Sequence, residues 1–307
     1  MFKSNFFFFF GYGELGNQMF QYVFFRSYLP NNSIIITCNI NEIKKFIDLD
    51  KNFKFIEIKN KFLKLFCQKL LNKFFMILSK LRVINSIDTE LMQYKKFKYE
   101  GKKVFNKKGL FPITFIYPRY FQNKHFFNED IENNLNFKKN HLESAKEFFR
   151  KLPHNTTPIF IHVRSCRRHN EFKKFKIFGK TGVDLPDGYF NQGIQWFNNN
   201  IENPYYIIMS DNFDFVKKKF SFLKNKVFSN NNIYTDLLII AMCNNGIMSN
   251  SSISWWGSYY AKNKNKIFAP KYWYGWKSKI THQAYAVPDY AETIDPNIFV
   301  EEDAISK

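Results

Sequence analysis

The sequence predicts an α/β protein of two domains, each built on a largely parallel β-sheet. The chain has 307 residues, 45% of them hydrophobic, which is enough for two separate cores. Short apolar runs bounded by Gly, Asn or Pro alternate with longer segments of helical periodicity, the pattern of βαβ units. We place the domains at residues 1–145 and 146–307.

The first domain is expected to open with a strand, a glycine turn and a helix. The Phe-rich run at residues 5–10 is predicted to be a buried strand, residues 11–16 the turn, and residues 17–28 the helix. A secretory signal peptide is the alternative, because Lys3 precedes the apolar run. That run is too short, however, and a glycine turn follows it in place of a cleavage site. Strands are expected next at 33–38 and 54–58.

A long amphipathic helix is predicted over residues 61–81. Its polar side carries Lys61, Lys64, Gln68, Asn72 and Lys73, and its apolar side carries Phe62, Leu65, Phe66, Leu70, Phe74 and Leu78. One interpretation is a surface helix packed on the domain through its apolar side. The other is a helix that lies on a membrane surface and seeks anionic lipid.

The second domain has the clearer pattern. Between 82 and 136 only short strands near Val104 and Phe115 are predicted. Helices are then expected at 140–152, 186–198, 235–242 and 252–260, and strands at 158–163, 205–210, 246–249 and 267–269.

Composition limits the class of protein without choosing a function. The formal net charge of +20 favours contact with polyanions such as nucleotide diphosphates, nucleic acid or anionic lipid. The chain has no recognisable nucleic-acid reader motif, so nucleic acid is not an expected partner. The four cysteines lie far apart without a CxxC pair, which indicates a reduced, cytosolic protein with neither a disulfide frame nor a zinc ribbon. No apolar run reaches the about 18 residues of a membrane span.

The turn GYGELG at residues 11–16 fits the pattern GxGxxG between a strand and a helix. In that setting the backbone at Gly13 and Gly16 can hold a phosphate group at the helix N-terminus. A dinucleotide-binding (NAD or FAD) oxidoreductase is therefore an alternative function. It requires an acidic residue at the end of the second strand, where Asn39 stands and Glu42 is the nearest acid.

Two further segments place polar side chains where parallel sheets bind ligands. The strand at 158–163 brings His162 and Arg164 to its carboxyl end, and arginine offers a fixed fork of donors to a diphosphate. The string SNSSISWWG at 249–257 puts hydroxyl groups at a helix start, where they can cap the helix or bind phosphate.

Taken in order, these segments resemble glycosyltransferase family 11, the α-1,2-fucosyltransferases. The matching strings are LGNQMFQY at 15–22, YFQ at 120–122, HVR at 162–164, LPDGYF at 185–190, MSDN at 209–212, CNNGI at 243–247 and NSSISWWG at 250–257. The resemblance extends from residue 11 to about residue 276.

This resemblance implies a GT-B type fold, in which two Rossmann-like domains face a cleft. The N-terminal domain with the glycine turn is then the acceptor side, and the C-terminal domain binds the GDP-sugar donor. It further implies GDP-fucose as donor substrate, no cofactor or obligatory metal, and inversion at the anomeric carbon. The implied acceptor is a glycan with a terminal galactose, fucosylated at O2 in surface polysaccharide or lipopolysaccharide. The enzyme would be cytoplasmic, with peripheral contact at the inner, anionic face of the membrane.

The sequence departs from the family pattern at two places. The HVRRGD motif of the family is HVRSCR here, so its second Arg and its Asp are missing, and Arg167 or Arg168 could replace the lost charge. Glu14 stands where the family usually has a second glycine. Both changes concern the identity of the acceptor and of the transferred sugar.

Fucosyl transfer needs the departing diphosphate neutralised and the attacking hydroxyl deprotonated or oriented. Arg164 is our candidate for the diphosphate, with His162 positioning the nucleotide and Asp211 accepting from ribose or guanine. Donor binding is completed by the serine hydroxyls of the helix start, Ser251, Ser252 and Ser254.

Asn17 is predicted to lie near the phosphates and the acceptor. Glu14 is our hypothesis for the base, and the alternative interpretation of Glu14 is a solvated turn residue without a catalytic role. Asp187 and the hydroxyl groups themselves are the alternatives for the base. The DxD string Asp48-Leu49-Asp50 resembles a manganese motif of other transferases but lacks its surroundings, and we interpret it as coincidence.

Overall fold

The computed structural model describes residues 5–94, 97–128, 135–165, 184–273, 276–279, 281 and 285–299. The chain divides into two compact units, Met1–Lys138 and Lys139–Lys307. Helix α6 (Lys139–Arg150) therefore belongs wholly to the second unit, whereas a boundary at 145/146 would divide it.

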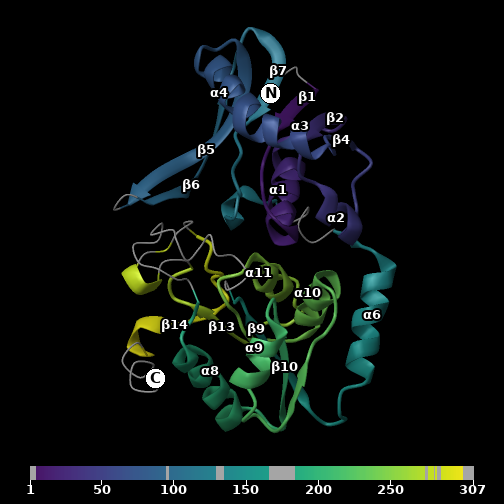
Figure 1. The fold of residues 1–307 in the computed structure, drawn as a ribbon, viewed down its shortest axis with the longest axis vertical. Helices are drawn as coiled ribbons and strands as arrows, with labels where there is room; N and C mark the ends of the chain where they lie inside the picture. Colours follow the sequence, from purple (N-terminus) through teal and green to yellow (C-terminus); the bar gives the residue numbers. More distant parts are fainter. Residues whose placement is uncertain are drawn as a thin grey trace. The chain divides into compact units, whose positions relative to one another are not determined.

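The first unit is built on a six-stranded sheet in the order β4-β2-β1-β7-β5-β6 (Figure 1). Its neighbouring strands are parallel, except that β6 runs antiparallel to β5. The strands are β1 (Phe6–Phe9), β2 (Ser33–Thr37), β4 (Phe53–Glu57), β5 (Ile84–Tyr94), β6 (Phe97–Lys107) and β7 (Phe111–Ile116). Two short strands, β3 (Ile47–Asp48) and β8 (Asn136–Phe137), form a separate antiparallel pair.

The core of the first unit is mainly phenylalanine. Phe7 and Phe9 of β1 and Phe24 of α1 are fully buried, and the Phe24 ring stacks on Phe121 at 3.8 Å between centroids. The helical segments are α1 (Leu15–Tyr28), α2 (Asn41–Phe46), α3 (Lys61–Phe66), the π-helical η1 (Cys67–Leu71), α4 (Asn72–Lys80) and the 3₁₀ turn η2 (Lys124–Phe126).

The helical segment 61–80 packs on the domain, but through another side than the one expected. Leu71, Phe75 and Leu78 pack against the core, and Gln68 and Asn72 are buried beside them. Most of the predicted apolar side is exposed instead, Phe62 by 82% and Phe74 by 53%. The cause is the chemistry beneath the helix: buried backbone carbonyl groups there need hydrogen-bond donors, and these two amides supply them.

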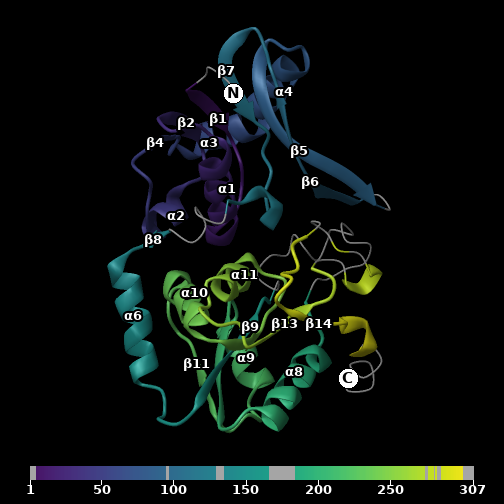
Figure 2. The same cartoon turned by 180° about the vertical axis from the view of Figure 1, so that it is seen from behind.

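The second unit contains a six-stranded, all-parallel sheet in the order β11-β10-β9-β12-β13-β14 (Figure 2). The strands are β9 (Thr157–Val163), β10 (Pro204–Ser210), β11 (Lys226–Phe228), β12 (Asn245–Ile247), β13 (Lys266–Pro270) and β14 (Glu292–Ile294). Besides α6 the helices are α8 (Asp187–Asn200), α9 (Phe213–Lys219), α10 (Ile233–Met242) and α11 (Ser252–Tyr259), with 3₁₀ turns η5 (Trp276–Ser278) and η6 (Pro296–Phe299).

Helices cover this sheet and complete its core. Tyr189 and Phe197 of α8 and Phe220 beside α9 are fully buried against the strands. Helix α6 lies alongside α10 in both views (Figures 1 and 2), and the His141 and Tyr234 rings meet at 4.8 Å.

Helix α10 begins at Ile233, before the predicted start at residue 235. The side chain of Asn232 accepts hydrogen bonds from the backbone N–H groups of Tyr234 and Thr235, so Asn232 is the N-cap of the helix.

Across the described ranges, no helix is both long enough and apolar enough to cross a membrane.

Candidate active site

In the second unit, the predicted ligand-binding residues meet at a topological switch point. From β9 the chain builds outward to β10 and β11 on one side, and later to β12, β13 and β14 on the other. Open α/β sheets bind ligands at such a point, beyond the carboxyl ends of the strands. His162 and Arg164 lie at that end of β9, and Ser249 follows β12 directly beside them.

Ser249 joins the two strand ends. Its hydroxyl oxygen lies 2.8 Å from Nδ1 of His162 and accepts a hydrogen bond of 3.1 Å from the backbone N–H of Arg164. His162 and Ser249 are both buried, so these bonds are shielded from water. The loop that carries the Arg164 side chain is thereby fixed relative to the imidazole ring.

The imidazole of His162 is electrically neutral in this environment. Burial, with a smaller contribution from the Arg164 charge, lowers the pKa of His162 from 6.5 to about 3. A group of that pKa does not exchange protons near neutral pH, so His162 is a poor general acid or base there. With Nδ1 directed at Ser249, Nε2 is left for another hydrogen bond, which suits a positioning role.

Asp211 holds the other side of this loop. One of its carboxylate oxygens, Oδ1, accepts a hydrogen bond of 2.8 Å from the Ser165 N–H, and Oδ2 lies 3.4 Å from Nη1 of Arg164. Arg164 and Asp211 thus form an ion pair whose side chains are 30% and 19% exposed. In the part of the chain that the structure describes, Asp211 Oδ2 and the Ser165 hydroxyl are buried without a hydrogen-bond partner. The guanidinium group is thus held by a carboxylate at the strand ends while part of it remains exposed to a ligand.

The serine cluster shapes the N-terminus of α11. The hydroxyl of Ser251 caps the helix by accepting from the Ile253 N–H at 3.3 Å. Ser254 is fully buried and donates to the carbonyl oxygens of Ser249 and Ser251, both at 3.1 Å. These two hydroxyls therefore hold the loop, whereas Ser252 is half-buried at the first helical position, where an anion is stabilised by the helix dipole.

The glycine turn of the first unit occupies the corresponding switch point, between β1 and β7. Side-chain amides donate to the four consecutive carbonyl oxygens from residue 10 to residue 13: Asn72 to Phe10 at 3.0 Å, Gln68 to Gly11 at 2.8 Å, Gln21 to Tyr12 at 2.9 Å, and Gln18 and Asn39 to Gly13 at 3.0 and 2.7 Å. Donors from several elements thus fix the turn in one conformation.

Gln18 is the central member of this network. Its Nε2 also donates to Oδ1 of Asn39 at 3.0 Å, and its Oε1 accepts from the N–H groups of Glu42 and Ile43 at 3.0 and 3.1 Å. One buried side chain therefore supports the glycine turn and caps the start of α2. Asn39 occupies the place of the acidic residue that a dinucleotide site needs, and Glu42 lies inside α2.

The glycine-turn residues predicted for the site lie close together. Gly13 has a φ of +123°, and a Cβ atom there would come within 2.4 Å of the Asn17 Cβ, so only glycine fits. Gly16 and Asn17 belong to the first turn of α1, and Glu14 is its exposed N-cap residue. The Glu14 carboxylate makes no capping hydrogen bond to any residue that the structure describes.

Segment 120–122 fixes the side chain of Asn17 through a hydrogen bond. Gln122 is buried and donates through Nε2 to Oδ1 of Asn17. The backbone of this segment is held by Glu100, whose Oε1 accepts from the N–H groups of Tyr120 and Phe121, both at 3.2 Å. Phe121 has a left-handed φ of +56°, an uncommon conformation that this carboxyl group stabilises.

Glu100 makes the stability of the first unit depend on pH. Burial raises the pKa of Glu100 from 4.5 to about 7, against the opposing effects of the Phe121 N–H and of Arg119. Because the unfolded chain loses this proton near pH 4.5 and the folded chain near pH 7, wild-type stability falls as pH rises through that window. Glu100→Gln keeps the acceptor and cannot ionise. We expect the variant to gain about 3 kcal/mol relative to wild type between pH 4.5 and pH 8.

Urea unfolding of both proteins across this pH range measures the difference. Asp236, whose pKa burial also raises to about 7, is present in both and cancels. The exposed Glu202→Gln is the control, and it should leave the pH dependence unchanged. A pH-independent difference between Glu100→Gln and wild type would contradict the assignment.

The DxD string is engaged in local structure. The Asp50 carboxylate pairs with Arg26 at 3.4 Å and accepts a hydrogen bond of 2.9 Å from the Asn52 N–H. The backbone N–H of Asp50 donates to the Tyr22 hydroxyl oxygen at 2.7 Å. Within the described ranges, no group of three or more His, Cys, Asp or Glu side chains is arranged to hold a metal ion.

Several residues of the two sites were not singled out from the sequence. Ser249, Gln18 and Gln122 stand inside the recognised strings but carried no predicted role. Gln68 and Asn72 were assigned to the solvent-facing side of a helix. Their spacing of four residues, which places two uncharged amides on the same side of the helix, is the signal that could have indicated a buried polar position. The candidate replacements Arg167 and Arg168 lie outside the described residues.

Comparison with known proteins identifies the family. The profile of "Glycosyl transferase family 11" matches residues 10–290. An α-1,2-colitosyltransferase of Escherichia coli is 24% identical over 292 residues, covering 85% of this chain and 90% of the relative. The O-antigen biosynthesis glycosyltransferase WbnK of Escherichia coli is 27% identical over 169 residues, 52% of this chain and 51% of the relative.

Solved structures agree on the fold. The NodZ α-1,6-fucosyltransferase co-crystallised with GDP superposes with a TM-score of 0.50 at 9% identity, covering 83% of this chain and 91% of NodZ. POFUT1 in complex with GDP-fucose gives a TM-score of 0.50 at 10% identity, covering 88% and 99%. These similarities confirm the predicted α/β, GT-B type fold. With a family profile that spans nearly the whole chain, the protein belongs to glycosyltransferase family 11.

Proposed function

We propose that this glycosyltransferase moves L-fucose from GDP-fucose to a hydroxyl group of a glycan, with inversion at the anomeric carbon. The observation that carries the proposal is the arrangement of His162, Arg164, Asp211 and Ser249 at the switch point of the second unit. It offers a guanidinium fork, a helix N-terminus and a neutral imidazole, which together fit a nucleoside diphosphate. Two proteins of similar fold, NodZ and POFUT1, were crystallised with GDP and GDP-fucose respectively, which supports this donor class.

In this proposal the second unit binds the donor and the first unit binds the acceptor. As the bond between fucose and GDP breaks, negative charge grows on the departing diphosphate and positive charge on the sugar ring. Arg164 and the first turn of α11 would neutralise the diphosphate, and His162 would hold the nucleotide through Nε2. Asp211 would orient Arg164 and accept a hydrogen bond from ribose or guanine.

Because Arg164 and the first turn of α11 supply the positive charge at the diphosphate, we expect turnover to persist in the presence of a metal chelator.

The proposed acceptor is a terminal galactose, modified at O2, in a bacterial surface polysaccharide or lipopolysaccharide. The Escherichia coli relatives, an α-1,2-colitosyltransferase and an O-antigen glycosyltransferase, support a glycan acceptor and this linkage. The proposed place of action is the cytoplasmic face of the inner membrane. The oxidoreductase alternative finds no support, because Asn39 replaces the required acid and the chain belongs to a transferase family.

A transfer assay tests the reaction. The enzyme is incubated with GDP-fucose or GDP-colitose and a galactose-terminated oligosaccharide, and the product is analysed by mass spectrometry and NMR. Transfer of fucose in α-1,2 linkage is the expected result. Preferential use of GDP-colitose, or a product with another linkage, would overturn the assignment of sugar or acceptor.

Glu14 is the proposed base that removes the proton from the attacking hydroxyl. Its carboxylate is exposed and free of capping bonds to the described residues, so Glu14→Gln should leave folding intact. We expect kcat to fall by about 100-fold or more, the usual contribution of a general base. Asp187→Asn is the matched comparison, because Asp187 is exposed and pairs with Lys219. Full turnover of Glu14→Gln, or a large loss only in Asp187→Asn, would refute the role of Glu14.

A further inference from the structure

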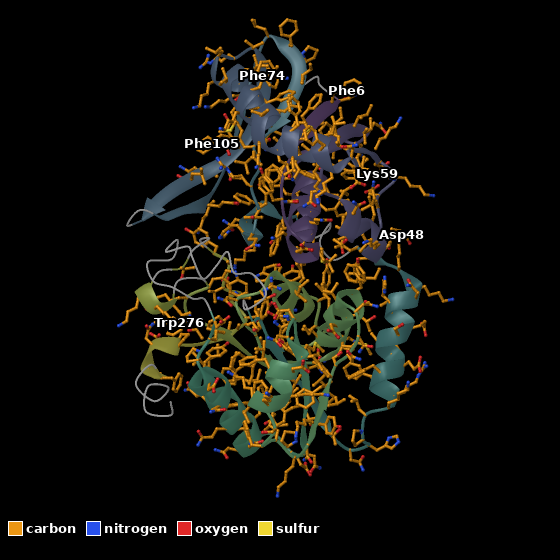
Figure 3. The ribbon with its side chains drawn as sticks, viewed as in Figure 1. Phe6, Asp48, Lys59, Phe74, Phe105 and Trp276 are labelled. Carbon is orange, nitrogen blue, oxygen red and sulfur yellow. The ribbon has the colours of Figure 1, made fainter. Side chains whose placement is uncertain are left out.

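The helical segment 61–80 exposes a continuous apolar stripe. Phe62, Phe66, Leu70, Phe74, Ile77 and Leu81 recur at helical spacing, and each is between 44% and 82% exposed. Figure 3 marks Phe74 on this segment. Large contiguous apolar surfaces of this kind indicate a binding face, because a protein that keeps such a surface in water loses stability and solubility.

The stripe continues beyond the end of α4. Leu110 and Phe111 are 85% and 57% exposed, and their N–H groups donate to the carbonyl oxygens of Arg82 and Val83 at 3.0 and 2.9 Å. These bonds place the backbone of Leu110 and Phe111 beside the two residues that directly follow Leu81. We call the six residues of the stripe, together with Leu110 and Phe111, the apolar ridge.

The chain segment that carries the apolar stripe holds charges of one sign only. Between Glu57 and Asp88 the sequence has no acidic residue, and it carries Lys59, Lys61, Lys64, Lys69, Lys73, Lys80 and Arg82. Lys61, Lys69, Lys73 and Lys80 are exposed beside the stripe, as are Lys107 and Lys108 before Leu110. A protein partner or a second copy of this basic chain would have to tolerate these charges, whereas an anionic bilayer attracts them.

The other side of the same helical segment is fixed by core packing of Leu71, Phe75 and Leu78 and by polar contacts. Gln68 and Asn72 bind the glycine turn, and the Ser79 hydroxyl lies 2.8 Å from that of Tyr117. The segment therefore cannot turn its apolar side inward without leaving the carbonyl groups of Phe10 and Gly11 unpaired. Exposure of the stripe is thus a consequence of how the helix supports the site.

We propose that the apolar ridge is a membrane-docking surface, with the helical segment 61–80 lying in the interface of an anionic lipid bilayer. Apolar side chains would enter the boundary between headgroups and acyl chains, and the flanking lysines would contact anionic headgroups. Docking needs neither donor nor acceptor, so it is independent of the proposed transfer reaction. It would bring the glycine turn, on the opposite side of the same helix, near membrane-bound acceptors.

Vesicle flotation of the full chain tests the proposal. The vesicles contain phosphatidylcholine alone or phosphatidylcholine with phosphatidylglycerol, each at low and high salt. We expect binding only with phosphatidylglycerol, weakened by salt because the lysine contacts are screened. Absence of binding by the folded wild-type enzyme would overturn the proposal.

Two sets of variants separate the apolar and the charged contributions. The apolar set is Phe62→Ser, Leu70→Ser and Phe74→Ser combined, with the exposed Phe222→Ser and Ile298→Ser as its control. The charge set is Lys61→Gln, Lys69→Gln and Lys73→Gln combined, with Lys217→Gln, Lys218→Gln and Lys224→Gln as its control. The charge set should weaken vesicle binding by about 100-fold, since each lysine contributes about fivefold. The controls should bind like wild type.

Retained GDP-fucose binding or an unchanged melting curve verifies that the variants are folded. An equal loss of vesicle binding in the variants and in their controls would show a nonspecific attraction and refute the docking role of the apolar ridge. If wild type is a dimer that does not bind vesicles, and the apolar variant is a monomer in sedimentation velocity, the apolar ridge is a contact between copies of the chain.

Discussion

Arg164→Ala is expected to lower kcat/KM for the GDP-sugar by about 100- to 1,000-fold, the effect of removing one preorganised donor from a developing negative charge. The guanidinium group is the cation that Asp211 and the Ser249-bound loop hold in place at the strand ends. Lysine offers a point charge and no planar fork, so Arg164→Lys should recover only part of the loss. Steady-state kinetics and donor titration of each variant measure the effect.

The controls for this prediction separate charge from structure. Arg150→Ala removes an exposed arginine from the same unit and should change nothing. Because Arg164→Ala leaves Asp211 without its ion-pair partner, the double variant with Asp211→Asn is also required. If that double variant recovers wild-type kcat/KM, the loss came from an uncompensated carboxylate, and Arg164 does not bind the diphosphate.

Gln18→Leu is expected to destabilise the first unit by about 2–5 kcal/mol, because it leaves several buried polar groups unpaired. The N–H groups of Glu42 and Ile43 lose their acceptor, and the Gly13 carbonyl loses one of its two donors. Because the glycine turn is fixed by this network, turnover should fall together with stability. Urea unfolding and the transfer assay, run on the same preparations, test both effects.

Gln192→Leu is the matched control, since it makes the same replacement at an exposed position of α8. Its effect on the free energy of unfolding should stay within about 0.5 kcal/mol. Equal stability of Gln18→Leu and Gln192→Leu would show that the observed bonds of Gln18 contribute nothing net.

The sequence predicted the central strands of the second unit, such as β9 and β10, because they are buried on both faces, whereas the edge strands β11 and β14 are less buried and were not predicted. Strands such as β9 and β10 are continuous apolar runs that end in polar residues, so both their position and their ligand-binding ends can be read directly. The position of His162 and Arg164 at a ligand-binding strand end follows from this pattern. The role of Ser249 does not, because it depends on β9 and β12 being neighbours, which spacing along the chain cannot show.

The first unit was harder to predict for two physical reasons. Strands β5 and β6 are long, polar and joined as a hairpin with a register shift between Thr89 and Leu91, so no simple alternation marks them. Only short strands near Val104 and Phe115 were expected there. Segment 61–80 misled because amphipathicity predicts that the apolar side is buried, whereas the buried carbonyl groups of the glycine turn required its amide side.

Calorimetric titration of the wild-type enzyme with GDP-fucose, GDP-mannose, UDP-galactose and NAD tests the central claim most directly. The account predicts that the GDP-sugars bind, that UDP-galactose and NAD do not, and that Arg164→Ala loses this binding. Binding of NAD, or failure of every guanine nucleotide to bind, would contradict the assignment of the β9–β12 switch point as a GDP-sugar site.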